Sequence, residues 1–326
     1  LAQGQSACLT SRACAWHVRC VRQMAQVGQP PMDDGGIAGG SSEVVAPRPR
    51  RDDFLTLDLL GEGSVGSVSR VMHRASGNFY ALKAIDKRKI LDNGLAEQLL
   101  AEVKVQLTVA HPNLLRCHDY FEEGGSVFLV LELVSGGDLY KHLQSHGPLS
   151  EPDTAHVLAQ IASGVAHLHE SGVMHRDLKA ENVLLYGDLE VKVADFGWCA
   201  QGNPLAQQRT TFCGTPCMLA PEMLEGKPYC AGVDVWAVGV LLFEMLVGSS
   251  PFDRGGGIME TCRNIARGLD DALAARLPAG ARPLARMLLA SEPAARGRLS
   301  DVPSHHWVAT GVATRRGGAA VLGAAS

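Results

Sequence analysis

The chain has 326 residues, of which 46% are hydrophobic and 20% are charged, and its formal net charge is −4. These values are ordinary for a globular protein with one large domain or two lobes. The small negative charge argues against nucleic acid as the main partner, and no apolar run approaches the ~18 residues that span a bilayer. We therefore expect no direct nucleic-acid binding and no membrane insertion.

Nine cysteines are scattered along the chain, and no two of them form a C-x-x-C pair. Their odd number and their spacing disfavour a zinc ribbon or a disulfide framework. Cys8, Cys14 and Cys20 recur every six residues around His17, but we interpret them as chance members of an unstructured segment.

The first part of the chain lacks the patterns of a folded domain. Residues 1–32 contain three arginines and no acidic residue, which is compatible with an organelle transit segment or with upstream sequence outside the folded protein. Residues 30–51 are rich in Pro, Gly, Ser and Arg, as in a linker. We expect residues 1–52 to form a low-complexity, disordered N-terminal extension.

From Phe54 onward, short runs of alternating apolar and polar residues predict strands. A helix is expected between Leu95 and Val109, where the apolar spacing changes. The expected strands are Phe54–Leu57, Ser67–Val71, Phe79–Ile85 and Val127–Leu133.

Helical patterns dominate from Leu139 onward, with long examples at Thr154–Glu170 and Val233–Leu246. The pattern predicts an α+β protein of two lobes, with a small β-rich lobe at 53–133 and a larger helical lobe at 134–308. The Gly- and Ala-rich residues 309–326 are expected to form a disordered tail.

The glycine cluster is the first motif that indicates chemistry. The segment from Gly61 through Gly63 and Gly66 to Val68 fits G-x-G-x-x-G-x-V, a pattern found in protein kinases, in which backbone amides approach the phosphates of ATP. A dinucleotide-binding fold uses similar glycines, and Asp86 could serve as its ribose-binding acid. That fold requires a helix after the glycines, whereas a strand pattern follows here.

A lysine and a glutamate complete the expected ATP site of the small lobe. Lys83, in Ala81-Leu82-Lys83, lies on a strand and resembles the kinase lysine that holds the α and β phosphates. Glu102 is expected to orient it, because Gln106 follows one turn later on the same helix face. Glu97 is the competing choice.

The strongest signal is the stretch His175-Arg176-Asp177-Leu178-Lys179-Ala180-Glu181-Asn182, which resembles the kinase catalytic loop. Asp177 is expected to accept the proton of the substrate hydroxyl, and Lys179 to neutralise charge on the transferred phosphoryl group. Asn182 and Asp195, in Asp195-Phe196-Gly197, are expected to hold Mg²⁺ through oxygen atoms. Together these motifs imply a bilobal protein kinase that uses ATP and Mg²⁺.

Several neighbouring residues are expected to stabilise the fold and take no part in chemistry. His175 and Phe196 are interpreted as packing residues beneath the site. Glu222, in Ala220-Pro221-Glu222, and Arg296 resemble the ion pair that ties the activation segment to the late helices. Asp234 resembles the buried aspartate that supports the backbone of the catalytic loop.

Four features resemble the Aurora family within the protein kinases. They are Trp198 directly after Asp195-Phe196-Gly197, the segment Arg209–Thr215, the spacing of Glu102 and Gln106, and the segment Val247–Phe252. The resemblance implies that the backbone of Glu132–Val134 binds adenine beside the gatekeeper Leu131, and that Asp138 faces the ribose. It also implies a role in cell division, in the cytoplasm and nucleus and at the spindle, centrosome or chromosomes.

The chain departs from the Aurora pattern at three positions. Ala180 replaces a proline of the catalytic loop, and Met218 replaces a tyrosine before Ala220-Pro221-Glu222. Ala101 stands where the family carries a basic residue beside Glu102. No reacting group is lost, so the rival interpretation of an inactive kinase-like scaffold is disfavoured. A polo-like or cyclic-nucleotide-type kinase is the other alternative.

Three expectations concern substrate recognition and regulation. Glu181 is expected to bind an arginine two residues before the target Ser or Thr of a protein substrate, with Asp138 as a second carboxylate, unless Glu181 is merely a solvated charge. Thr211, with Arg209 at that spacing, is the expected activating phosphosite, and Arg176 its first partner. Because Ala101 lacks a cation, we expect phosphorylation to activate only partly, with a partner or the protein's own flanks completing the position of Glu102. The resemblance implies a partner of the spindle or inner-centromere type.

Overall fold

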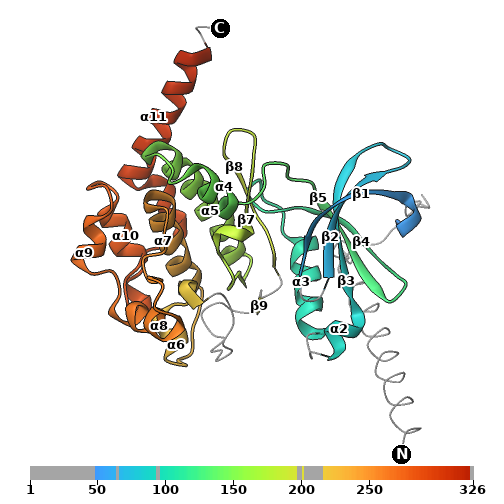
Figure 1. Ribbon diagram of the computed structural model, residues 1–326, viewed down its shortest axis with the longest axis horizontal. Coiled ribbons are helices and arrows are strands. Elements are labelled where there is room, and N and C mark those ends of the chain that lie inside the picture. Colours follow the sequence, from blue (N-terminus) through green and yellow to red (C-terminus); the bar gives the residue numbers. More distant parts are fainter. Residues whose placement is uncertain (1–47, 64–65, 93–95, 197–199, 202–215, 324–326) are drawn as a thin grey trace, which may run out of the picture. The chain divides into compact units, whose positions relative to one another are not determined.

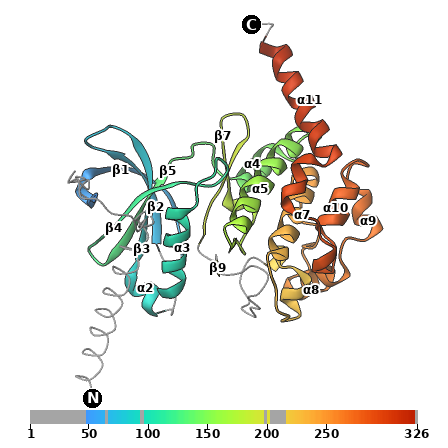
Figure 2. The same cartoon turned by 180° about the vertical axis from the view of Figure 1, so that it is seen from behind.

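The computed structural model describes residues 48–63, 66–92, 96–196, 200–201 and 216–323 (Figures 1 and 2). The chain divides into two compact units. The first unit comprises Leu1–Thr108 and Arg116–Leu133, and the second comprises Val109–Leu115 and Val134–Ser326. The β-rich first unit and the helical second unit confirm the α+β fold expected from the sequence.

The first unit is built on one five-stranded antiparallel sheet of order β1-β2-β3-β5-β4. The alternation that predicted strands fits a core of Phe54, Val71, Leu82, Phe121 and Val130, which pack together on the sheet. The elements of this unit are η1 (Arg51–Asp53), β1 (Phe54–Glu62), β2 (Gly66–His73), β3 (Phe79–Asp86), α2 (Lys87–Asp92), α3 (Ala96–Thr108), β4 (Cys117–Glu123) and β5 (Ser126–Glu132).

Residues 109–115 belong to the second unit, although the sequence placed them in the small lobe. The reason is that their backbone is hydrogen-bonded to a strand of the second unit. The N–H of Leu115 donates to the carbonyl of Val193 at 2.9 Å, and the N–H of Val193 donates to the carbonyl of Asn113 at 2.8 Å. These reciprocal bonds fasten the segment to strand β8 (Glu190–Val193) of the helical unit.

Helix α5 (Glu151–Glu170) begins at a capping serine followed by a proline. The Ser150 side chain caps the helix by accepting a hydrogen bond from the N–H of Asp153, and Pro152 lies in the first turn, where its missing N–H costs nothing. Helix α7 (Gly232–Val247) is apolar on almost every side and is buried, and it ends at Gly248 with φ 77°.

The remaining elements of the second unit surround these two helices. They are α4 (Leu139–His146), β6 (Val173–Met174), η2 (Ala180–Asn182), β7 (Val183–Tyr186), β8, β9 (Ala200–Gln201), η3 (Pro216–Met218), α6 (Pro221–Leu224), α8 (Ile258–Arg267), α9 (Asp271–Ala275), α10 (Arg282–Leu288), η4 (Pro293–Ala295), η5 (Leu299–Ser304) and α11 (His306–Gly323). Within the described ranges, none of the helices combines the length and apolarity that crossing a membrane would require.

The expectation of a disordered tail from residue 309 is corrected, because helix α11 continues to Gly323 and runs along α5 (Figures 1 and 2). Small residues allow the close approach, since a Cβ atom on Gly311 would lie 2.5 Å from the Cβ of Ala155. Arg315 then fixes the helix. Its Nε lies 2.7 Å from Asp153 Oδ1, and an Nη lies 2.7 Å from Asp188 Oδ1.

We predict that Arg315→Ala loosens α11 from the second unit. The Arg315 side chain is 16% exposed, and its two ion pairs are partly screened by water, so the loss should be about 1 kcal/mol. That corresponds to a fall of ~2–4 °C in melting temperature. Arg316→Ala is the matched control, because Arg316 is exposed. Equal melting temperatures for the two variants would show that the ion pairs contribute nothing.

Candidate active site

Three residues expected at the nucleotide site lie on one face of the sheet in the first unit. Val68 of β2 pairs directly with Lys83 of β3, and Arg70 pairs with Ala81. Directly paired residues share a face, and so do residues two apart on a strand. The register therefore brings Val68, Ala81 and Lys83 together on this face.

The three motif glycines differ in what the fold demands of them. A Cβ atom on Gly66 would lie 1.9 Å from the carbonyl oxygen of Ala84, so the pairing of β2 with β3 requires glycine there. Gly61 has no described atom within 4 Å of such a Cβ, and for Gly63 the nearest is 3.8 Å away. Strand pairing alone thus explains Gly66, but it leaves Gly61 and Gly63 without a steric reason.

For the other residues expected at the nucleotide site, the structure gives mainly the position of the backbone. Glu102 lies on α3, but its side chain, like that of Glu97, lies outside the described part of the structure. Gln106, on the same helix, is buried. Glu132 ends strand β5, where its N–H donates to the carbonyl of Arg116 at 2.9 Å, and Val134 follows in the second unit.

In the second unit, the expected catalytic residues are in direct contact. Lys179 Nζ lies 3.0 Å from Asp177 Oδ2. The Nδ2 of Asn182 donates to the backbone carbonyl of Asp177 at 2.7 Å and to its Oδ2 at 3.2 Å. Because the amide nitrogen of Asn182 faces Asp177, the amide oxygen is the group left to act as a ligand.

Asp195 is linked to this cluster through the backbone. The carbonyl of Asn182 accepts a hydrogen bond from the N–H of Ala194 at 2.8 Å, one residue before Asp195. Asp195 has φ 66° and Arg176 has φ 65°. Such left-handed conformations cost roughly 1–3 kcal/mol in residues with a side chain, and they are concentrated at functional sites.

Asp234 supports the backbone of the catalytic loop, as the sequence predicted. Its carboxylate is 1% exposed and accepts hydrogen bonds from the backbone N–H groups of His175 at 2.9 Å and Arg176 at 2.8 Å. The ring of His169 donates to it at 2.7 Å. Burial by itself would raise the pKa of Asp234, but these hydrogen bonds and the nearby histidines outweigh burial and lower it.

Two further structural expectations are confirmed. His175 and Phe196 are buried, with ring centroids 5.7 Å apart, and His175 Nε2 donates to the carbonyl of Ala194 at 3.1 Å. Glu222 and Arg296 form a buried bidentate ion pair, with both N–O distances at 2.7 Å. The first arrangement holds the catalytic loop against the segment before Asp195, and the second joins α6 to the segment after η4.

Asp138 has a structural role that the sequence analysis did not foresee. It caps helix α4, because its Oδ1 accepts a hydrogen bond from the N–H of Lys141 at 2.8 Å, and its Oδ2 lies 3.0 Å from Lys141 Nζ. Gly136 precedes it in close contact with β7, where a Cβ atom would lie 2.3 Å from the carbonyl oxygen of Leu185.

Sequence analysis missed Glu244, which lies on α7 near the exposed Glu181 of η2. Burial and, to a lesser extent, the charge of Glu181 raise the pKa of Glu244 to about 7. No hydrogen bond or ion pair joins the Glu244 carboxylate to another described residue. The signal was available in the sequence, because Asp234 and Glu244 are the two charged residues of this otherwise apolar helix.

The same acidic group affects Cys217 of η3. Burial, followed by the charges of Glu244 and Asp253, raises the pKa of its thiol to about 11. Gly197, Trp198 and the segment Arg209–Thr215, including Thr211, lie outside the described residues.

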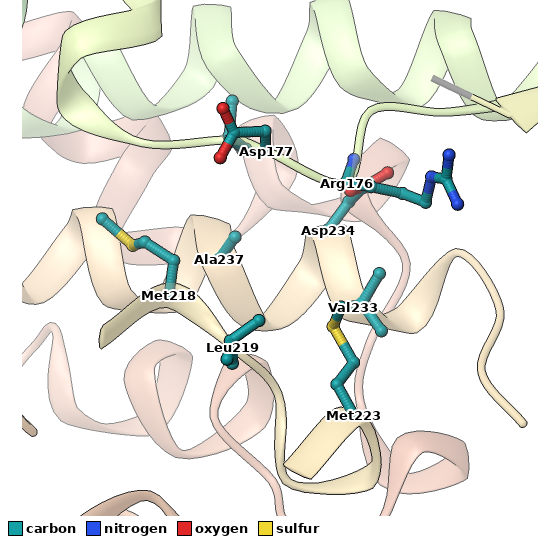
Figure 3. Close-up of a pocket in the computed structure, with 9 residues that line it drawn as sticks. Arg176, Asp177, Met218, Leu219, Met223, Val233, Asp234 and Ala237 are labelled. Atoms are coloured by element: carbon teal, nitrogen blue, oxygen red, sulfur yellow. The ribbon is translucent and has the colours of Figure 1, made fainter. Parts of the chain in front are cut away.

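Figure 3 shows a small cavity beside the catalytic loop. Three segments line it, and most of their contributing side chains are apolar. Met218, which replaces a tyrosine of the family pattern, lies on its wall. The lining residues are Arg176, Asp177, Leu178, Met218, Leu219, Met223, Val233, Asp234 and Ala237.

We predict that Asp234→Asn lowers kcat by about 10- to 100-fold. An amide has one acceptor oxygen and would turn an NH₂ group toward the backbone donors, which loses a charge-assisted hydrogen bond of ~1.5–3 kcal/mol. The measurements are steady-state kinetics and melting temperature. Asp271→Asn, at a side chain that is 95% exposed, is the control. A folded Asp234→Asn protein with full activity would contradict the proposed support.

Comparison with known proteins agrees with this geometry. Residues 54–308 match the protein kinase domain family. The chain is 40% identical to Aurora kinase C of Mus musculus, over 79% of this chain and 92% of the relative, and 38% identical to Aurora kinase B of Xenopus tropicalis, over 83% and 75%. It is 37% identical to an Aurora kinase of Saccharomyces cerevisiae, over 79% and 69%. The chain therefore belongs to the Aurora family of protein kinases and is an enzyme that uses ATP and a divalent metal to phosphorylate Ser and Thr residues of proteins.

Proposed function

We propose that Asp177 is the catalytic base and that Lys179 neutralises charge on the transferred phosphoryl group. The observation that carries this proposal is the direct contact of Asp177 with Lys179 at 3.0 Å and with the amide of Asn182. Asp177 accepts the proton of the substrate hydroxyl and directs its oxygen toward phosphorus, and Lys179 supplies positive charge beside it.

We propose Mg²⁺ as the divalent metal, held by Asn182 and Asp195. Both offer oxygen atoms, which hard cations prefer, and no group of three or more His, Cys, Asp or Glu side chains that could hold a metal occurs among the described residues. A two-residue set suits Mg²⁺, because Mg²⁺ takes its other ligands from water and phosphate. When bound, Mg²⁺ would neutralise phosphate charge and orient the group to be transferred.

We assign the remaining nucleotide contacts to the residues that the sequence motifs identified. Lys83, oriented by Glu102, would hold the α and β phosphates, and the open space around Gly61 and Gly63 supports close approach of phosphate to the backbone. The proposed contacts of adenine and ribose are Val68, Ala81, Glu132, Val134 and Asp138. Asp138 would have to contact the ribose while its Oδ1 still accepts the capping hydrogen bond from the N–H of Lys141.

We predict that Lys83→Met and Asp195→Asn each lower turnover by at least about 100-fold, because phosphoryl transfer depends on positioned charges. The assay measures phosphate transfer from ATP to a peptide, and circular dichroism checks the fold. Lys104→Met is the matched control, since Lys104 is an exposed lysine on α3. Turnover in either variant close to that of the control would refute the assigned roles.

We propose that Glu181 and Glu244 together select an arginine two residues before the target hydroxyl. Glu244 is a largely buried carboxylate without a partner among the described residues, and Glu181 lies close enough to raise its pKa. Two carboxylates that repel each other attract a guanidinium strongly, because the guanidinium relieves the repulsion and can form bidentate contacts. Arg209 stands at the same spacing before Thr211 in the chain itself.

We predict that the preference for arginine depends on pH through Glu244. Its pKa of about 7 means that lowering the pH from 8 to 6 protonates the carboxylate and removes its charge. The ratio of kcat/KM for an Arg peptide to that for a Gln peptide should therefore fall several-fold over this range. Glu244→Gln should lower the ratio at pH 8 and remove most of its pH dependence.

Thermal unfolding provides a second measurement on the same variant. A pKa raised from 4.5 to about 7 in the folded state means that ionised Glu244 opposes folding as the pH rises through this window. Glu244→Gln should accordingly raise the melting temperature more at pH 8 than at pH 5.

The kinetic measurement decides the arginine site itself. Unchanged peptide selectivity in both Glu244→Gln and Glu181→Gln would reject the proposed arginine site.

We propose that phosphorylation of Thr211 activates the enzyme and that an activator protein of the spindle or inner-centromere type completes the activation. Arg176, next to Asp177, is a cation suited to a phosphate, while Ala101 supplies none beside Glu102. A role in cell division, in the cytoplasm and nucleus and at the spindle, centrosome or chromosomes, is the setting we propose. Its support is the similarity to Aurora kinases.

A further inference from the structure

An arginine two residues before a serine or threonine occurs at three places in the chain: before Ser76, Thr211 and Ser300. Thr211 is the proposed activating site. The other two lie in described parts of the structure, so their surroundings show which of them another kinase molecule could reach. This comparison rests on the arginine preference proposed above.

Ser76 lies in the turn between β2 and β3. Figure 1 shows the two strands that this turn connects. Residues 74–79 are all exposed. The serine hydroxyl makes local contacts, with its Oγ 2.9 Å from His73 Nδ1 and 3.3 Å from the N–H of Asn78. The turn holds no buried side chain. Opening it into an extended substrate conformation breaks local hydrogen bonds, including those from the N–H of Gly77 to His73 and from the N–H of His73 to Asn78, but exposes no core residue.

Arg74 is also accessible at the start of the turn. Its Nε donates to the backbone carbonyl of Asp52 at 3.0 Å, and its N–H donates to the carbonyl of Asp53. The first bond is a single exposed contact to a neutral acceptor. A pair of carboxylates can therefore replace it with a stronger, charge-assisted interaction.

Ser300 is presented much less favourably. It lies within η5, and the preceding Leu299 is only 2% exposed, so an extended conformation would pull a core residue into water. Arg298 is engaged with Asp301, at 3.2 Å, and the Ser300 hydroxyl also faces Asp301. Arginine spacing alone therefore does not distinguish the two serines, but burial does.

We propose that Ser76 is a second phosphorylation site of this kinase, modified by another copy of the same chain that recognises Arg74. The Ser76 hydroxyl oxygen forms a bond to the γ-phosphorus of ATP, and the bond from that phosphorus to the oxygen bridging it to the β-phosphate breaks. ADP leaves with the electron pair, and the hydroxyl proton passes to Asp177 of the acting copy. The product phosphate adds about −2 charge and competes with the Asp52 carbonyl for Arg74.

The test uses the full chain in two forms. An inactive ¹⁵N-labelled copy carrying Asp195→Asn is mixed with a small amount of active, unlabelled protein, ATP and Mg²⁺, and mass spectrometry follows phosphate on the labelled copy. We expect phosphate on Ser76, at least about tenfold faster than on Ser300. Arg74→Ala in the labelled copy should slow the modification of Ser76 at least tenfold. Arg70→Ala, at an exposed arginine of β2 with no serine two residues later, should not.

The outcomes separate this inference from the proposed specificity. If the enzyme prefers an arginine peptide but leaves Ser76 unmodified, the Ser76 site is refuted and the arginine preference stands. If Arg74→Ala and Arg74→Lys both leave the rate at Ser76 unchanged, recognition through Arg74 is refuted. If no arginine preference appears with peptides, the specificity proposal itself fails, whatever happens at Ser76.

Discussion

The buried carboxylate of Asp234 joins parts of the second unit that are far apart in the sequence. It lies on α7, binds the backbone of His175 and Arg176, and receives a hydrogen bond from His169 at the end of α5. A buried charge is tolerated only when donors surround it, so these segments have to meet at one point. Asp177 follows directly after the two held residues, and its position therefore depends on a contact outside the reacting groups.

The same constraint explains why the neighbouring backbone tolerates strain. Arg176 is held with a positive φ, and it is also one of the residues whose N–H binds Asp234. A left-handed conformation in an arginine persists only where surrounding contacts enforce it. The bidentate pair of Glu222 and Arg296 adds a second fixed point, which joins α6, before α7, to the segment after η4.

Sequence patterns identified the motifs and several of the strands and helices, because both rest on local spacing. The strand Phe79–Ile85 and the helix Val233–Leu246 agree with β3 and α7 to within one residue at each end. Two contacts between distant residues, the Glu222–Arg296 ion pair and the support of the catalytic loop by Asp234, were predicted through the family resemblance. Contacts that no motif marks could not be predicted. Helix α11 was missed because Gly and Ala indicate disorder unless a surface such as α5 lies close by.

The site residues also divide into those whose contacts follow from a local motif and those whose contacts depend on the folded structure. The contact of Asp177 with Lys179 and Asn182 follows from a loop motif of eight residues. The capping role of Asp138 depends on where α4 begins. The raised pKa of Glu244 depends on burial and on the distance to Glu181. Neither burial nor that distance is encoded by spacing along the chain.

The raised pKa of the Cys217 thiol is a consequence of burial, to which the acidic neighbours add. With a pKa of about 11, roughly one thiol in 10⁴ is ionised at pH 7. The thiolate is the form that attacks oxidants and alkylating reagents, so Cys217 should be a slow nucleophile for a partly exposed cysteine. Glu244, which is proposed to bind a substrate arginine, thus adds to the burial that keeps this nearby sulfur atom protonated at neutral pH.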